Sequence, residues 1–212
     1  MRYIILDDDG KECGGTLCKQ WNSMQDYAED SSKYYYAGDL RVLFLFEESE
    51  IKDDVERLAT VQGKAAMRRL TSKDGEKASL AITLFQEVVE EENYPWAKRV
   101  MGLAVSECET LLYRLSKSRI TGNRSLDNGR DFKEEYCIEL KVDDTFSDTT
   151  ANKLLRTIHD YIVSRVLFEW ASITYEELNV LWAGKVEADT KEIEKEAKRS
   201  GSGDAKITQS WV

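Results

Sequence analysis

Few side chains in this sequence could perform nucleophilic or metal chemistry. The 212 residues include four cysteines and one histidine, His159, which lies within a strongly helical pattern. Structural zinc sites usually combine two close pairs of cysteine or histidine, whereas Cys13 and Cys18 form a single pair. We therefore expect free thiols in a reducing compartment and a structural role for His159 at a helix boundary or interface. The alternative is a Cys–His nucleophile pair, in which the fold would bring His159 to Cys108 or Cys137.

Carboxylate and aromatic clusters give equally little indication of catalysis. The acidic runs at residues 7–9, 90–92 and 143–144 do not have the spacing of a calcium-binding loop, and Gly14-Gly15 lacks the Lys and Ser or Thr of a phosphate-binding loop. The aromatic residues at 34–36 could stack on bases, but surrounding acidic residues favour core packing or a protein interface. The sequence thus predicts no enzyme activity, no cofactor, and no catalytic, cofactor-binding or metal-ligating residue.

The charge balance disfavours general binding to nucleic acid. The formal net charge is −10 and the pI is about 4.8, whereas phosphate backbones are bound by basic surfaces. An acidic wall would instead let a polyanion such as DNA pass without adhering to it. No apolar run approaches the roughly 20 residues that span a bilayer, and the N-terminus is too short and acidic for a secretory signal. We expect no membrane partner and synthesis in a cytoplasm.

Hydrophobic periodicity predicts a mainly α (α+β) fold, a helical bundle with a small antiparallel β component. Alternating or continuous apolar runs predict strands at residues 3–6, 40–46 and 136–142. Helical spacing predicts helices from Ser49 (as N-cap) to about residue 70, over 78–89, from Pro95 to the basic residues near 119, and from Ser147 or Asp148 to about Trp170. We expect Trp170 to be buried against the core formed by that long helix and the 136–142 strand.

The chain divides by composition into three parts. Residues 1–48 are rich in strand patterns, residues 49–199 form a helical core that includes the 136–142 strand, and residues 200–212 resemble a flexible arm. The pattern leaves open whether the strands of residues 1–48 form a separate small domain or join the 136–142 strand in one sheet.

The last helix and the arm carry the candidate protein-binding residues. Thr174 and Glu177 have the spacing of a capping box, and Leu178, Leu181, Trp182 and Val186 are predicted to face inward. From Asp189 the helix becomes highly charged, so we expect its outer half to project into solvent or to lie against a partner. After the Ser-Gly-Ser-Gly stretch, apolar side chains offer anchors for assembly. The predicted interface residues are Glu192, Lys195, Arg199, Ile207, Trp211 and Val212.

Residues 99–199 resemble virion proteins of phages and prophages of Bacteroidetes. The residues that carry the resemblance are Arg99-Val100-Met101-Gly102-Leu103-Ala104, Glu107 to Tyr113, a strand and acidic turn at 136–146, and the helix core Ile158-His159-Asp160-Tyr161-Ile162-Val163 followed by Trp170. The resemblance implies a structural protein of the virion, of the head–tail connector, neck adaptor or tail-completion type. It further implies a homo-oligomeric ring of identical subunits that contacts portal, neck or tail proteins, and a location in the host cytoplasm during assembly.

That family's C-terminal arm is expected to be basic, whereas this chain has Ala205-Lys206-Ile207-Thr208. Contact between the arm and DNA is therefore not expected. The alternative function is a cytoplasmic helical adaptor or regulatory protein that binds a single protein partner.

Overall fold

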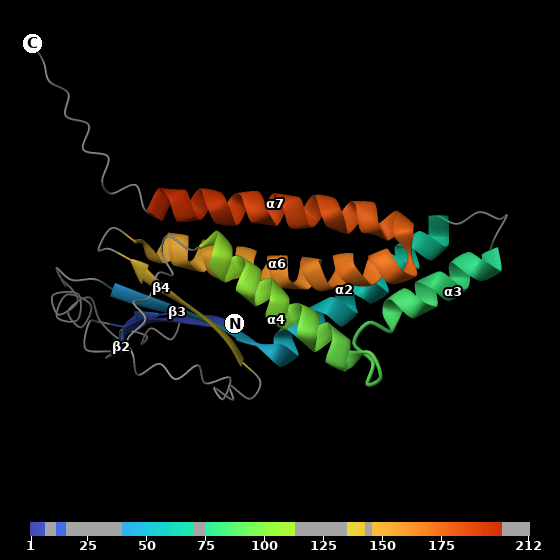
Figure 1. Ribbon diagram of the computed structural model, residues 1–212, viewed down its shortest axis with the longest axis horizontal. Coiled ribbons are helices and arrows are strands. Elements are labelled where there is room, and N and C mark those ends of the chain that lie inside the picture. The colour runs from blue at the N-terminus through green and yellow to red at the C-terminus, as the bar shows by residue number, and fades with distance from the viewer. Residues whose placement is uncertain (7–11, 16–39, 70–74, 113–134, 143–145, 201–212) are drawn as a thin grey trace, which may run out of the picture.

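A four-stranded sheet covers one end of a bundle of long helices (Figure 1). The computed structural model describes residues 1–6, 12–15, 40–69, 75–112, 135–142 and 146–200. Its helices are α2 (Glu48–Arg69), α3 (Gly75–Gln86), α4 (Tyr94–Leu111), α6 (Asp148–Thr174) and α7 (Glu176–Ser200). The mainly α fold with a small antiparallel sheet is confirmed.

The sheet contains β1 (Arg2–Leu6), β2 (Glu12–Gly15), β3 (Leu40–Glu47) and β4 (Glu135–Val142), in the order β2-β1-β3-β4. All neighbours are antiparallel, and Phe44 of β3 lies opposite Ile138 of β4. The described strands of residues 1–48 therefore share one sheet with the strand at 135–142, which answers the question that the sequence left open.

One face of the sheet packs against the helices and forms part of the hydrophobic core. Because side chains alternate between the faces of a strand, every second residue of β3 and β4 points towards the helices and is buried. These residues are Val42, Phe44, Phe46, Ile138, Leu140 and Val142. The alternation predicted for the 136–142 strand is confirmed, with Lys141 exposed on the other face.

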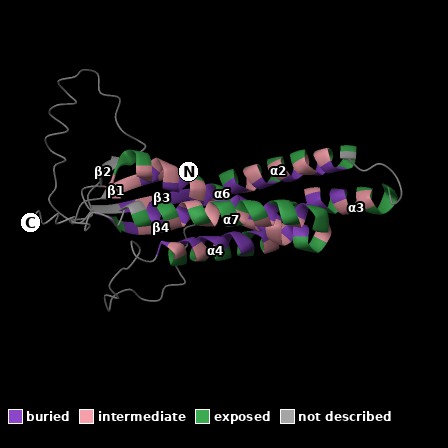
Figure 2. Ribbon diagram, turned by 90° about the horizontal axis from the view of Figure 1, so that it is seen from above, coloured by how far each residue is buried: buried purple, intermediate pink, exposed green. Residues whose placement is uncertain are grey.

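The 27-residue α6 is the central element of the bundle. It contacts α2, α3, α4 and α7 and reaches β1 and β3 at its N-terminal end. Ser147 caps it by accepting a 3.2 Å hydrogen bond from the Thr150 amide, as predicted. Tyr3 of β1 donates a 3.2 Å hydrogen bond to Asp148 in its first turn, and this joins helix and sheet. Figure 2 shows buried positions along the bundle and exposed positions on its outer surfaces.

The sequence predicted the start of α4 correctly but not the start of α2. Pro95 stands in the first turn of α4, as expected, since a missing amide hydrogen costs nothing there. Helix α2 begins directly after β3 at Glu48 rather than with a cap at Ser49. Glu48 is 8% exposed and accepts hydrogen bonds from Tyr94 and, at 2.9 Å, from the Lys98 ammonium group. The acid thus links α2 to α4, and the predicted N-cap at Ser49 is wrong because Ser49 lies inside the helix.

The junction between α6 and α7 overturns the predicted capping box. Thr174 is the last residue of α6, and its hydroxyl donates to the Trp170 carbonyl at 2.8 Å. Tyr175 adopts an extended backbone conformation and separates the two helices. Glu177 accepts a 2.9 Å hydrogen bond from the Tyr175 hydroxyl instead of reaching back to Thr174.

Candidate protein-binding surface

The C-terminal half of α7 packs against α6, contrary to the expectation that it projects away from the core. Ile193, Glu196 and Ala197 are at most 7% exposed. The Lys153 ammonium group of α6 lies 2.7 Å from a Glu196 carboxylate oxygen and also pairs with Glu192. A buried acid is tolerated when it is paired, so the high charge of this segment includes an inward-facing contact.

The predicted interface residues therefore divide into three groups. Glu192 pairs with Lys153 of α6 and lies 3.3 Å from Lys195. Its carboxylate therefore helps to hold α7 against α6. Lys195 is 60% exposed and is available to a partner. Arg199 lies in the last turn of α7, while Ile207, Trp211 and Val212 fall outside the described residues.

A cluster of charged and phenolic groups joins α4 to α6. Arg165 donates to both oxygens of Glu107, at 3.0 and 3.2 Å, and the Tyr161 hydroxyl donates to Glu107 at 2.7 Å. Burial would raise the pKa of Glu107, but these hydrogen bonds and the adjacent guanidinium lower it below its ordinary value. Arg165 also pairs with Glu169 one turn away at 2.5 Å. Every partner in this cluster is a side chain of the same chain, so it functions as a link between helices.

A second polar link joins α6 to α7. The fully buried Ser164 hydroxyl donates to the Asp189 carboxylate at 3.1 Å, and Lys185 lies 3.6 Å from the same carboxylate. Burial raises the pKa of Asp189, which is opposed by Lys185 and by the Ser164 hydrogen bond. These contacts fix the position of α7 along α6.

The described thiols do not have the environment of a nucleophile. Cys108 is fully buried in α4, and burial, with Glu107 and Glu109 nearby, raises the pKa of its thiol. A reactive thiol needs the opposite shift, because the thiolate is the attacking species. Cys137 is a half-buried cysteine in β4. His159 lies 3.8 Å from Asp54 of α2, while Cys18 and the acidic runs at 7–9 and 143–144 lie outside the described residues.

His159 is nevertheless a site of pH-dependent stability. The side chain is 5% exposed, and burial lowers its pKa below 6.5, although Asp54 and Asp160 partly counteract this. Below pH 6.5 the unfolded chain binds a proton that the native imidazole resists, so this residue should destabilise the fold progressively as the pH falls.

The expected result is that His159→Gln loses less stability than the parent between pH 7.5 and pH 5, a range chosen to bracket the ordinary histidine pKa of about 6.5. Urea unfolding at a series of pH values measures the difference. Parallel pH profiles for the two proteins would contradict a neutral, buried imidazole.

Within residues 1–6, 12–15, 40–69, 75–112, 135–142 and 146–200, no group of three or more His, Cys, Asp and Glu side chains converges as a metal site would. None of the described helices is both long and apolar enough to cross a membrane.

The α2–α3 pair presents a surface with exposed apolar side chains. Leu80 is 62% exposed and Leu84, one turn later on α3, is 41% exposed, while Val61 and Met67 of α2 are 54% and 39% exposed. Val61 and Met67 are six residues apart and therefore lie on different sides of α2, so we call Leu80 and Leu84 alone the hairpin surface. Inward positions of α3, Ile82 and Phe85, are fully buried, so α3 is apolar on two faces and the hairpin surface is its outer one.

The outer face of α7 is the second such surface. Val180 is 77% and Leu181 50% exposed, which corrects the prediction that Leu181 faces inward, while Leu178 and Trp182 are buried as expected. Gly184, Ala188, Lys191 and Lys195 continue the same exposed side of the helix. In Figure 1, α7 forms one edge of the molecule, with α6 beneath it.

Sequence reasoning missed both surfaces, although a signal was present. Leu80 and Leu84 repeat at helical spacing outside the inward stripe of α3, and Val180 is out of phase with Trp182 and Val186. A second apolar stripe on an amphipathic helix indicates either a wider buried face or a surface that binds a partner.

Comparison with family models, curated proteins and solved structures found no match to this chain.

Proposed function

We propose that this chain is a structural subunit of a phage virion, of the head–tail connector, neck adaptor or tail-completion type, and that it acts by binding neighbouring proteins. The observation that carries the proposal is the hairpin surface, where Leu80 and Leu84 stay exposed although the inward side chains of the same helix are fully buried. Exposed apolar side chains grouped on one part of a protein are typical of sites for protein partners.

The arrangement of the polar groups supports a binding role over a chemical one. In the described residues the strongest polar clusters join one helix to another: Glu107 with Arg165, Glu196 with Lys153, and Glu48 with Lys98. Such links hold the helices in fixed relative positions. A rigid frame reduces the ordering cost of binding, because its surfaces are already in their bound conformation.

The particular class of particle rests on the resemblance of residues 99–199 to virion proteins. Ring subunits contact copies of themselves and also proteins of the rings above and below. We propose that the hairpin surface contacts a neighbouring portal, neck or tail protein, since it lies on α3, outside the segment that carries the resemblance. The C-terminal residues Ile207, Trp211 and Val212 are proposed as a further assembly contact.

Replacing Leu80 with glutamate tests the proposal. Because the parent side chain is 62% exposed, Leu80→Glu should change the free energy of unfolding by no more than about 0.5 kcal/mol. It should nevertheless reduce incorporation of the chain into particles by about tenfold or more, since a charge would be buried at the contact. Immunoblots of particles purified from a host that expresses the variant measure this.

The matched control is Ser79→Glu, which adds the same charge to the adjacent exposed position of α3. This variant should enter particles like the parent. Equal incorporation of both variants would contradict a role for the hairpin surface. Recovery of the parent only in a complex with one cytoplasmic protein would favour the adaptor function.

A further inference from the structure

The outer face of α7 changes in charge along its length. The acidic Glu177 lies in the first turn, an apolar centre follows, and the basic residues Lys191, Lys195 and Lys198 lie towards the C-terminal end; all of these positions are exposed. The centre comprises Val180, Leu181, Gly184 and Ala188. The acidic and basic ends are therefore separated by a mainly apolar segment that has a glycine at its middle and the exposed Glu187 at its C-terminal edge.

We propose that this face binds a second copy of the chain, with the two α7 helices antiparallel and related by a two-fold axis that passes near Gly184. In a two-fold contact the same patch is used on both subunits. A residue seven positions before Gly184 then faces the residue seven positions after it. Glu177 therefore lies opposite Lys191 of the second copy, and Lys191 lies opposite the second copy's Glu177.

The apolar centre is complementary to itself in part, because the same register brings Leu181 level with the exposed Glu187 of the second copy. Val180 and Ala188 are each four positions from Gly184, so the large side chain of one copy meets the small side chain of the other. A Cβ built on Gly184 has nothing within 4 Å, so no neighbour within the chain requires glycine there. Glycine lowers helix stability by about 1 kcal/mol relative to alanine. Its absent side chain lets two helix axes approach closely, since interaxial distance depends on the side chains at the crossing.

Glu177 and Lys191, the two charged residues that the register pairs, have only exposed partners to exchange. Lys191 pairs with Glu187 at 2.5 Å, with side chains 71% and 68% exposed, and Glu177 accepts the Tyr175 hydroxyl. Both contacts lie in solvent, where pairs contribute little. A contact to the second copy can therefore add to them or replace them without opening the core.

This inference goes beyond the proposed function, because a two-fold contact is not the head-to-tail contact that closes a ring; the dimer is a form of the purified chain. The outer face from Glu177 to Lys191 is about 21 Å long at the rise of an α-helix, so the interface is small and the dimer should be weak. We expect sedimentation to show a monomer–dimer equilibrium at protein concentrations between about 1 μM and 500 μM, a range that brackets the affinity of a small interface. Association should weaken as salt screens the charged pairs.

Charge exchange tests the antiparallel register. Glu177→Lys and Lys191→Glu should each weaken the dimer by about fivefold or more, because each places like charges opposite one another. The double variant Glu177→Lys with Lys191→Glu should restore association to near the parent value. Lys77→Glu, at an exposed position of α3, makes the same charge change as Lys191→Glu away from this face and should have no effect.

Gly184→Met tests the close approach independently of charge. The single chain has space for the methionine side chain, so the melting temperature at low concentration should not fall. Association should weaken by about tenfold or more, because a tenfold change corresponds to only a modest loss of contact energy. A chain that stays monomeric over the whole concentration range overturns the proposal. So does a dimer that none of these substitutions weakens, or one that the double exchange fails to restore. Particle incorporation is measured separately, so failure of the dimer and failure of the proposed function are distinguishable.

Discussion

Trp170→Ala should lower the free energy of unfolding by about 3–5 kcal/mol, the range measured for large aromatic deletions in protein cores. The indole is 9% exposed, lies 5.0 Å from the Trp96 ring, and donates its Nε1–H to the Leu84 carbonyl at 3.0 Å. Truncation removes contacts to α4 and to α3 together. Chemical denaturation followed by circular dichroism measures the loss.

Two substitutions in the same region separate burial from hydrogen bonding. Trp170→Phe keeps most of the aromatic packing but loses the Nε1–H donor, and should cost about 1 kcal/mol. Ile173→Ala truncates a side chain that is 66% exposed one turn later, and should change stability by no more than about 0.5 kcal/mol. A loss below about 1 kcal/mol for Trp170→Ala would mean that the indole does not hold the helices together.

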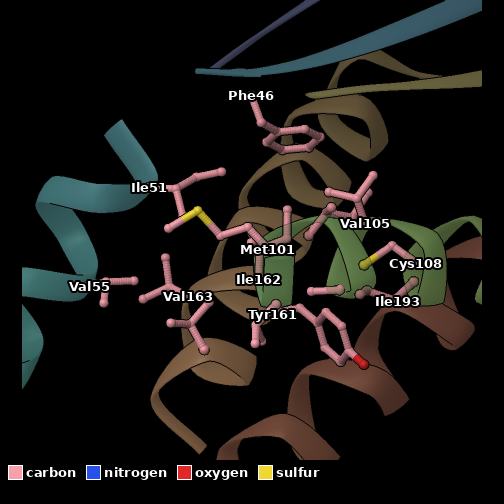
Figure 3. Close-up of a cluster of buried hydrophobic side chains, with 14 of the residues drawn as sticks. Phe46, Ile51, Val55, Met101, Val105, Cys108, Tyr161, Ile162, Val163 and Ile193 are labelled. Carbon is pink, nitrogen blue, oxygen red and sulfur yellow. The ribbon is translucent and has the colours of Figure 1, made fainter. Parts of the chain in front are cut away.

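Met101→Ala should cost about 2–5 kcal/mol, because it removes a fully buried side chain from the place where the sheet and helices meet. In Figure 3, Met101 of α4 lies among Phe46 of β3, Ile51 of α2 and Ile162 of α6. Met101→Leu is the matched control. It keeps most of the volume and should cost less than about 1.5 kcal/mol.

The same variant tests whether the sheet and the bundle unfold as one unit. Truncation of Met101 leaves a cavity between the sheet and the bundle. Met101→Ala should therefore lower amide protection by similar amounts in β3 and in α6. Amide hydrogen exchange resolves the two elements. Undiminished protection of β3 beside weakened protection of α6 would indicate that the N-terminal strands form a separate unit.

The fold class and the core could be predicted from the sequence because most elements have a clear period. The alternation in residues 136–142 identified β4 and its buried face, and Ser147 identified the start of α6. Pairing of β3 with β4 joins segments about ninety residues apart. No local pattern records such a pairing, since it depends on the tertiary arrangement.

Helix phase was harder to predict where a helix has two apolar stripes. Leu103 of α4 has helical spacing from the buried Val100 but is 54% exposed, and Leu181 of α7, predicted to face inward, is 50% exposed. Periodicity reports which residues share a face, but only the neighbouring elements decide where that face ends.

Charged side chains caused the largest error about the candidate site. Hydropathy placed Glu192 and Glu196 outside the core, yet Glu196 is 1% exposed, because Lys153 of α6 supplies its counter-charge. The failed capping box at Thr174 has a similar origin. A threonine hydroxyl can bond either to the following amides or to the carbonyl four residues before it, and Tyr175 ends α6 in a way that selects the second.

The most direct test of the proposed function is quantitative mass spectrometry of particles purified from a host that encodes this chain. A connector, neck or tail-completion subunit should be present in a constant ratio to the portal protein from one preparation to the next, at a copy number consistent with one ring per particle. It should also be enriched over host cytoplasmic proteins through successive purification steps. Loss of the chain during purification, with the protein recovered in the cytoplasm bound to a single partner, would contradict the proposal.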